Sequence, residues 1–261
     1  MKSALSVTHL IRHFLLFVFT VLFLLTVVRA GLNLWLLHKV GDVPTLTNSF
    51  LTGLRFDLAT IGYLLLVPIV VVTLLGIFKG TRAIARWFSL WWMMLALLLV
   101  MLLELVTPYF IHTASVRPDI HVFNAMEDPV ATVASLWSIY LVPALIGIVL
   151  VTLIAVAFWS RMDSNRFLRY PVVKWSGFLF LIVGVALCLL AIRSSIELKQ
   201  PALGPDAALI SVEGVVNEIA LNSTYKLLHS VLGEKFSIDG LQAMVLPGTL
   251  KPAADESQNT Q

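Results

Sequence analysis

Charged residues are scarce in this chain of 261 residues. They make up 13% of the total, whereas 59% of the residues are hydrophobic and the mean hydropathy is +0.92. A soluble domain needs more polar side chains than this to cover its surface. The shortage of charge therefore excludes an ordinary soluble protein and predicts an integral membrane protein.

Cysteine and the common catalytic motifs are also nearly or wholly missing. The single cysteine, Cys188, excludes an internal disulfide, and its apolar surroundings favour a small packing residue. No phosphate-binding glycine loop, nucleophile elbow or metalloprotease helix motif occurs in the sequence. These motifs therefore supply no candidate catalytic residue.

The formal net charge is +3 and the pI is about 9.1, a balance that often indicates a nucleic-acid partner. Here the basic residues form short clusters between apolar runs, which is typical of the loops that orient a membrane protein. No nucleic-acid partner is therefore expected.

Five apolar runs reach the roughly 20 residues that a helix needs to cross a bilayer. All five are expected to be helices, because the backbone must satisfy its own hydrogen bonds in lipid. The first is too long for a signal-peptide core, so it is interpreted as an uncleaved helix. The runs cover about residues 13–37, 54–78, 87–110, 133–159 and 172–193.

The basic clusters predict the orientation of these helices. Lysine and arginine gather at the amino end and in the loops after the second and fourth runs, so these parts are expected to be cytoplasmic. With five crossings, everything after about Arg193 is then expected outside. The clusters comprise Lys2 and Arg12; Lys79, Arg82 and Arg86; and Arg161, Arg166, Arg169 and Lys174.

Three regions follow from this pattern: a five-helix transmembrane domain over 1–195, an outward linker over 196–236, and a polar, disordered tail over 237–261. In the linker, four apolar residues share one helical face, which predicts an amphipathic helix lying on the membrane surface. Leu221 breaks the pattern, so a helix packed on another domain is an equal alternative. The four residues are Val212, Val215, Val216 and Ile219.

Four ionisable residues from three helices are predicted at similar depths near the outer interface: Arg29, Arg55, Asp57 and Glu104. An unpaired charge at such depth costs about 3 kcal/mol, so pairing is expected. Arg55 and Asp57 point to different sides of their helix, which leaves Arg29 and Glu104 as their complements. The two interpretations are ion pairs that fix helix packing and an arginine that binds a lipid phosphate.

The third loop carries several polar residues that invite a metal site, but their spacing matches no established ligand motif. A solvated loop is the stronger interpretation, with Arg117 meeting a lipid headgroup. Glu127, Asp128 and Pro129 form a start signal for the fourth helix. The polar residues of the loop are His112, Arg117, Asp119, His121, Glu127 and Asp128.

Three stretches carry a family resemblance: "FLTGLRFDLATIGYLL", "ELVTPYF" and "VNEIALNSTYKLL". Over about residues 10–235 the chain resembles the membrane portion of lipoteichoic acid synthase-like proteins, which are bacterial phosphoglycerol and phosphoethanolamine transferases of the alkaline phosphatase superfamily. The resemblance implies five helices followed by an outer amphipathic linker. In that linker the motif residues here are Asn217, Glu218, Asn222 and Tyr225.

In that family a sulfatase-like domain follows the linker. The resemblance implies that this domain holds a threonine nucleophile and a divalent metal, and that it transfers a lipid headgroup, commonly glycerol phosphate from phosphatidylglycerol. About 25 residues follow Phe236 here, too few for a domain with its own core. No counterpart of the catalytic residues, and no cofactor, is therefore expected in this chain.

The resulting expectation is a membrane module in the bacterial cytoplasmic membrane, with its carboxyl end periplasmic or extracellular. It would anchor and present lipid, bind anionic phospholipid such as phosphatidylglycerol, associate with a separate sulfatase-like catalytic domain, and be inactive alone. The alternative is a stand-alone anionic-lipid-binding or regulatory protein. A small-solute transporter is less attractive, because no inverted repeat is evident.

Overall fold

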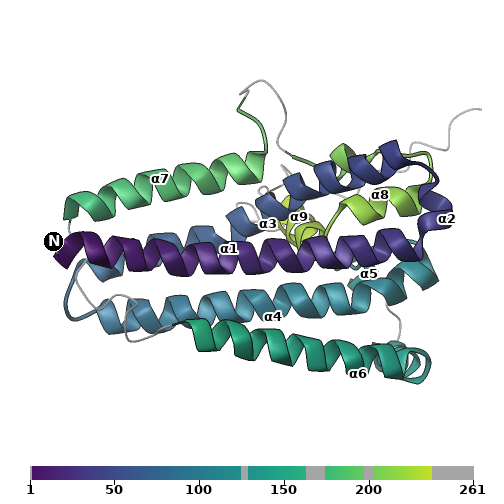
Figure 1. The fold of residues 1–261 in the computed structure, drawn as a ribbon, viewed down its shortest axis with the longest axis horizontal. Coiled ribbons are helices and arrows are strands. Elements are labelled where there is room, and N and C mark those ends of the chain that lie inside the picture. Colours follow the sequence, from purple (N-terminus) through teal and green to yellow (C-terminus); the bar gives the residue numbers. More distant parts are fainter. Residues whose placement is uncertain (1, 125–128, 163–173, 197–202, 237–261) are drawn as a thin grey trace, which may run out of the picture.

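The computed structural model describes residues 2–124, 129–162, 174–196 and 203–236. The described chain is all-α, and five of its helices are long and apolar enough to cross a membrane (Figure 1). This confirms the predicted fold class and the number of spanning helices. The five are α1 (Lys2–Trp35), α3 (Val43–Gly76), α4 (Arg82–Ala114), α6 (Pro129–Arg161) and α7 (Lys174–Arg193).

Short helices complete the described chain. They are α2 (Leu37–Val40), α5 (Ile120–Asn124), the 3-10 helix η1 (Pro205–Ala208), α8 (Gly214–Ala220) and α9 (Ser223–Phe236). In Figure 1 α8 lies toward the end of the bundle at which α1 finishes, opposite the amino terminus. This end is called the distal end below.

Helix α3 forms the centre of the bundle and contacts α1, α4, α7, α8 and α9. Its approach to α7 depends on Gly62, where an added Cβ would lie 2.8 Å from the carbonyl oxygen of Cys188. The spanning core is built from apolar residues of α1, α3 and α4, including Phe17, Val72 and Leu97. The exposed faces of α6 and α7 are strongly apolar, as helices facing lipid should be.

Helix length explains the shape of the distal end. Helices α1 and α3 have 34 residues each, or about 50 Å, whereas the hydrocarbon core is about 30 Å thick. Helix α7 has 20 residues and so matches that thickness. The longer helices therefore continue past the end of α7, and α8 packs beside them (Figure 1).

Helix α8 buries its apolar residues against the bundle. Val215, Val216 and Ile219 form a cluster with residues of α1 and α4, such as Leu32 and Ile111. This is the arrangement expected of a helix packed on another part of the protein. The predicted apolar face is corrected at one position, because Val212 precedes the helix and is fully exposed. Leu221, which breaks the surface-helix pattern, is buried, as the packed alternative predicts.

Helix α3 begins eleven residues before the predicted start at about residue 54. The side chain of Asp42 accepts a hydrogen bond from the backbone N–H of Thr45, and Pro44 stands in the first turn, two helix-start signals that apolarity alone does not register. Helix α6 begins at Pro129, as the start signal predicted, although residues 125–128 lie outside the described chain. The predicted disordered tail, residues 237–261, also lies outside it.

Candidate functional site

Arg29 and Asp57 form a buried ion pair between α1 and α3. Nη1 and Nη2 of Arg29 donate to Oδ2 and Oδ1 of Asp57 at 2.6 and 2.7 Å, and only 2% of Arg29 is exposed. This two-bond geometry suits the planar guanidinium. The pair requires glycine one turn earlier on α3, because a Cβ at Gly53 would collide with the guanidinium of Arg29.

Asn222 joins this pair to the carboxyl-terminal segment. Its Nδ2 donates to Oδ1 of Asp57 at 2.9 Å, and its Oδ1 accepts from the hydroxyl of Thr60 at 3.0 Å. The same Oδ1 accepts from the backbone N–H of Tyr225 at 2.7 Å, which caps the first turn of α9. One buried side chain thus both starts α9 and attaches it to α3.

Arg117 and Glu104 form a second buried ion pair. Nη1 of Arg117 donates to Oε1 and Oε2 of Glu104 at 3.0 and 2.8 Å, and Arg117 is 1% exposed. Nε of Arg117 donates to the backbone carbonyl oxygen of Glu218 at 2.6 Å. The backbone N–H of Ser223 donates to Oε1 of Glu104 at 2.7 Å, so this pair also contacts the start of α9.

The second pair has further support. The backbone N–H of Arg117 donates to Oε2 of Glu218 at 3.0 Å, and Nζ of Lys226 donates to both Glu218 oxygens at 3.0 and 3.1 Å. The hydroxyls of Thr107 and Ser223 lie 2.5 Å apart. The adjacent residues Asn222 and Ser223 thus attach to both ion pairs. We call this set the clamp: Arg29, Asp57, Glu104, Arg117, Glu218, Asn222 and Ser223.

Tyr225 and Asn217 order the rest of the linker. The hydroxyl of Tyr225 donates to the carbonyl oxygen of Leu203 at 2.5 Å, and its ring packs edge-on against Phe56. Burial raises the pKa of Tyr225, which keeps this donor protonated. Asn217 accepts from the backbone N–H of Ser211 at 2.8 Å and donates to the carbonyl oxygen of the same residue at 2.8 Å.

The structure brings together most of the residues singled out in the sequence, with two corrections. Glu104 pairs with Arg117, so its predicted pairing with Arg55 is wrong; Arg55 is exposed and its Nε donates to the hydroxyl of Ser194 at 3.0 Å. Burial of Arg117 also overturns the predicted solvated position with a headgroup contact. Arg117 reaches Glu104 because the chain turns back after the end of α4.

Sequence reasoning singled out Asn222 but missed the hydroxyl residues that bond within the clamp and to Arg55. Thr60, Thr107 and Ser223 are short hydroxyl residues in apolar surroundings, where a hydroxyl needs a partner, and that was the available signal. Gly53 carried the parallel signal of a glycine inside a helix. Ser194 had no signal of this kind, because it follows the end of α7.

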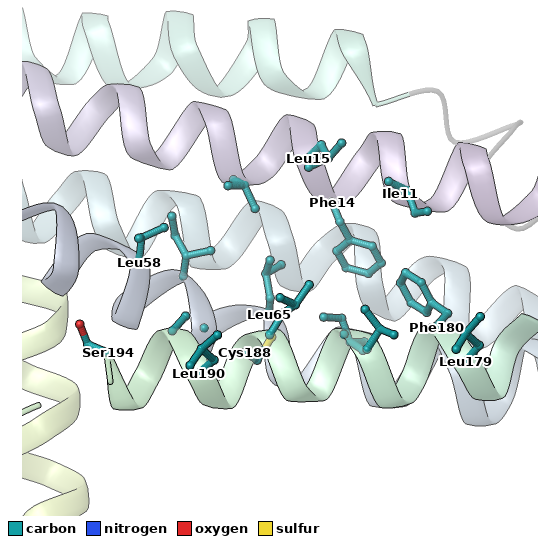
Figure 2. Close-up of a pocket in the computed structure, with 18 of the residues that line it drawn as sticks. Ile11, Phe14, Leu15, Leu58, Leu65, Leu179, Phe180, Cys188, Leu190 and Ser194 are labelled. Atoms are coloured by element: carbon teal, nitrogen blue, oxygen red, sulfur yellow. The ribbon is translucent and has the colours of Figure 1, made fainter. Parts of the chain in front are cut away.

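An apolar groove of about 1230 Å³ lies among α1, α3 and α7 (Figure 2). Figure 2 shows Phe14 of α1, Leu65 of α3 and Phe180 of α7 along it. Its polar end is formed by Ser194, the residue that binds Arg55. The groove can therefore hold an apolar ligand that ends in a group suited to a guanidinium.

Within the described ranges, no three histidine, cysteine, aspartate or glutamate side chains converge as a metal ion would require. In the third loop, Oδ1 of Asp119 accepts from the backbone N–H of Val122 at 2.8 Å, and Oδ2 lies 3.8 Å from Nζ of Lys226. Asp119 therefore serves as a helix cap and a weak ion-pair partner.

No known protein-family profile matches the chain, and no solved structure matches it. The five apolar helices establish a multi-pass membrane protein. The clamp and the groove are the two features on which a more specific function must be argued.

Proposed function

We propose that this chain is the membrane module of a lipoteichoic acid synthase-like phosphoglycerol or phosphoethanolamine transferase. It resides in the bacterial cytoplasmic membrane with its amino end cytoplasmic and its carboxyl end outside. It anchors a sulfatase-like catalytic unit, joined to it or made separately, and presents anionic phospholipid to that unit. The divalent metal and the transfer chemistry belong to the catalytic unit.

The clamp is the observation that carries this proposal. It attaches the segment leading out of the membrane to α1, α3 and α4 through two buried ion pairs. Removing one partner of a buried pair costs about 3–5 kcal/mol, so loss of either pair should loosen the segment. A headgroup transferase gains from this, because its active site must stay at one height above the bilayer to meet the lipid phosphate.

The stretches that carry the family resemblance are also those that build the clamp. "FLTGLRFDL" supplies Gly53 and Asp57, and "VNEIALNSTY" supplies Glu218, Asn222 and Ser223. A function tied to the position of the linker accounts for this coincidence. Lipid attraction alone would not need the two stretches to bond to each other.

Headgroup transfer in proteoliposomes tests the proposal. Labelled phosphatidylglycerol should release no phosphoglycerol with the purified chain alone, and should release it in a metal-dependent way when a sulfatase-like transferase domain is joined after Phe236. Asn222→Ala should lower that release, because it frees the linker, whereas Asn48→Ala on the exposed face of α3 should not. Metal-dependent turnover by the chain alone would contradict the proposal.

Cysteine labelling in intact cells tests the orientation. In a chain with Cys188→Ala, Val212→Cys at the distal end should react with a membrane-impermeant maleimide from outside. Gly80→Cys, in the turn between α3 and α4, has open space around it and should react only after the membrane is permeabilised. The opposite result would reverse the topology.

The alternative function is a stand-alone anionic-lipid-binding or regulatory protein. It is favoured by Arg55, an exposed cation bonded to the end of an apolar groove. A neighbouring gene for a sulfatase-like domain would favour the transferase module. Headgroup transfer that is insensitive to Asn222→Ala would favour the alternative.

A further inference from the structure

We infer that the groove among α1, α3 and α7 holds an acyl chain of a bilayer glycerophospholipid, whose phosphate is bound by Arg55 and Ser194. The inference rests on the proposed function, since it locates the lipid that the module presents. The lipid phosphate is thus assigned to Arg55 and not to Arg29 or Arg117, whose guanidinium groups are buried against carboxylates.

The groove exists because α7 packs on α3 and leaves a gap beside α1. Gly62 of α3 and Gly184 of α7 allow the close approach: a Cβ at Gly184 would lie 3.0 Å from Cγ2 of Ile69. Both glycines also line the groove. Its volume of about 1230 Å³ exceeds the roughly 300–1,000 Å³ of ordinary small-molecule pockets. At this depth lipid is the solvent, so an apolar groove will take a hydrocarbon chain.

The two ends of the groove match the thickness of a membrane. On the α7 side its lining begins at Ser176 and ends with Ser194, Ser195 and Ile196, which directly follow the helix. Between Ser176 and Ser194 lies about 27 Å of helix, close to the roughly 30 Å of a hydrocarbon core. Ser194 therefore lies at the boundary where the phosphates of one leaflet are found, and the bond to Ser194 places Arg55 at the same level.

Arg55 has the chemistry to bind a phosphate there. A guanidinium carries five N–H donors in a planar fork that suits phosphate oxygens, and the bond to Ser194 uses one of them. The backbone of Ser194 is fixed at the end of α7: φ is +55°, a left-handed value, and its N–H donates to the carbonyl oxygen of Leu190 at 2.8 Å. The side chain of Arg55 is exposed, so a lipid phosphate can reach it.

Photo-crosslinking in nanodiscs tests the site with the chain alone. The probe is phosphatidylglycerol with a diazirine at the middle of one acyl chain, in a phosphatidylcholine bilayer, and mass spectrometry maps the labelled residues. Labelling is expected at the middle of the groove, around Leu65, Val183 and Cys188. A diacylglycerol with the same chain, which lacks the phosphate, should label this region about tenfold less, as expected for loss of one charge-assisted interaction.

Two matched pairs of variants separate the headgroup from the groove. Arg55→Ala should reduce phosphatidylglycerol labelling about tenfold, whereas Lys39→Ala, which removes an exposed cation at the same end, should not. Val183→Trp fills the groove and should abolish labelling inside it, whereas Leu189→Trp, on an exposed part of α7 outside the lining, should leave it unchanged.

Three results would overturn the inference. The diacylglycerol could label the groove as strongly as phosphatidylglycerol does, or the labelling could be spread evenly around the bundle. Millimolar glycerol 3-phosphate could also displace the lipid, which would mean that Arg55 binds a soluble phosphate. The crosslinking experiment uses the chain without a catalytic unit, so a failed transferase assay would not change its result. Conversely, an empty groove beside a transferase that still responds to Asn222→Ala would reject this lipid site and keep the module.

Discussion

The clamp and the groove are both associated with α3, yet they follow opposite rules. In the clamp, two arginines are buried, and each donates to a carboxylate and to a backbone carbonyl. In the groove, the lining is apolar over most of its length and ends at a hydroxyl bonded to the exposed Arg55. The difference shows which arginines hold the structure together and which one is accessible to a ligand.

An arginine at the membrane boundary is therefore found in one of two situations here. Where a carboxylate is available at the same depth, the arginine packs inside and fastens the linker. Where the nearest group is a serine hydroxyl, the arginine stays at the surface. Substitutions can break the clamp in steps, and one reporter of the opening of α9 measures each step.

The reporter is Thr224→Cys in a chain that also carries Cys188→Ala. Thr224 is fully buried at the start of α9, and among the described residues its hydroxyl has no hydrogen-bond partner, so the substitution should be mild. Maleimide reacts with this thiol only when α9 opens, and the labelling rate in nanodiscs thus measures the opening free energy. A tenfold rate change corresponds to about 1.4 kcal/mol.

The largest effect is expected from Asp57→Ala. It leaves Arg29 buried without its carboxylate and removes the acceptor of Asn222, so the clamp should weaken by about 3–5 kcal/mol and labelling should accelerate more than a hundredfold. Asp42→Ala, which removes an exposed carboxylate outside the clamp, is the control. Adding Arg29→Met to Asp57→Ala should recover part of the loss, because no unpaired charge remains; no recovery would show that the pair is not coupled.

Glu104→Gln should have a smaller effect, of about 2 kcal/mol. The glutamine oxygen still accepts a hydrogen bond, and Nε of Arg117 keeps its hydrogen bond to the backbone carbonyl oxygen of Glu218. Asp57→Ala, in contrast, removes the acceptor of both Nη groups of Arg29. Reporter labelling of Glu104→Gln should therefore fall between Asp57→Ala and the parent. An effect as large as that of Asp57→Ala would mean that the neutral amide does not hold Arg117 in place.

The spanning helices were predictable because lipid imposes one rule along their whole length. About 20 apolar residues must form a helix, and the sequence contains five such runs. The sequence did not predict that α3 begins before residue 54, because residues 43–53 are less apolar and their helical state depends on a cap at Asp42. Apolarity thus locates the membrane, and capping locates the helix ends.

The candidate site was predictable only in part. Depth along the helices brought Arg29, Asp57 and Glu104 to one level, because helical rise is regular. The depth of a residue along a helix does not tell in which direction around the helix axis its side chain points, so the partner of Glu104 could not be chosen correctly. Arg117 pairs with Glu104 because the turn after α4 brings it back over that helix. The path of such a loop depends on tertiary contacts that local sequence does not encode.

Gly53→Ala tests how closely the Arg29 pair is fitted. A Cβ there would collide with the guanidinium of Arg29 and shift it from Asp57, so a net loss of about 1–2 kcal/mol is expected despite the gain in helix propensity. Gly31→Ala is the matched control: this glycine lies in α1 with nothing within 4 Å of an added Cβ, so the change should be neutral or stabilising by up to about 1 kcal/mol. Equal behaviour of the two variants would mean that Arg29 tolerates displacement.

The smallest expected effect is that of Tyr225→Phe, which removes the hydroxyl bonded to the carbonyl oxygen of Leu203 and keeps the ring packed on Phe56. One neutral hydrogen bond contributes about 1 kcal/mol, so labelling should rise about fivefold. Burial raises the pKa of Tyr225 above its ordinary value of 10.0, so its stabilisation is complete below that pH and declines as the pH rises above it. Tyrosinate absorbance near pH 10 should therefore be lower in the folded parent than in the denatured chain. In the Tyr225→Phe variant the difference in tyrosinate absorbance between the folded and the denatured chain should be smaller than in the parent. An unchanged difference would mean that the tyrosine with the raised pKa is not Tyr225.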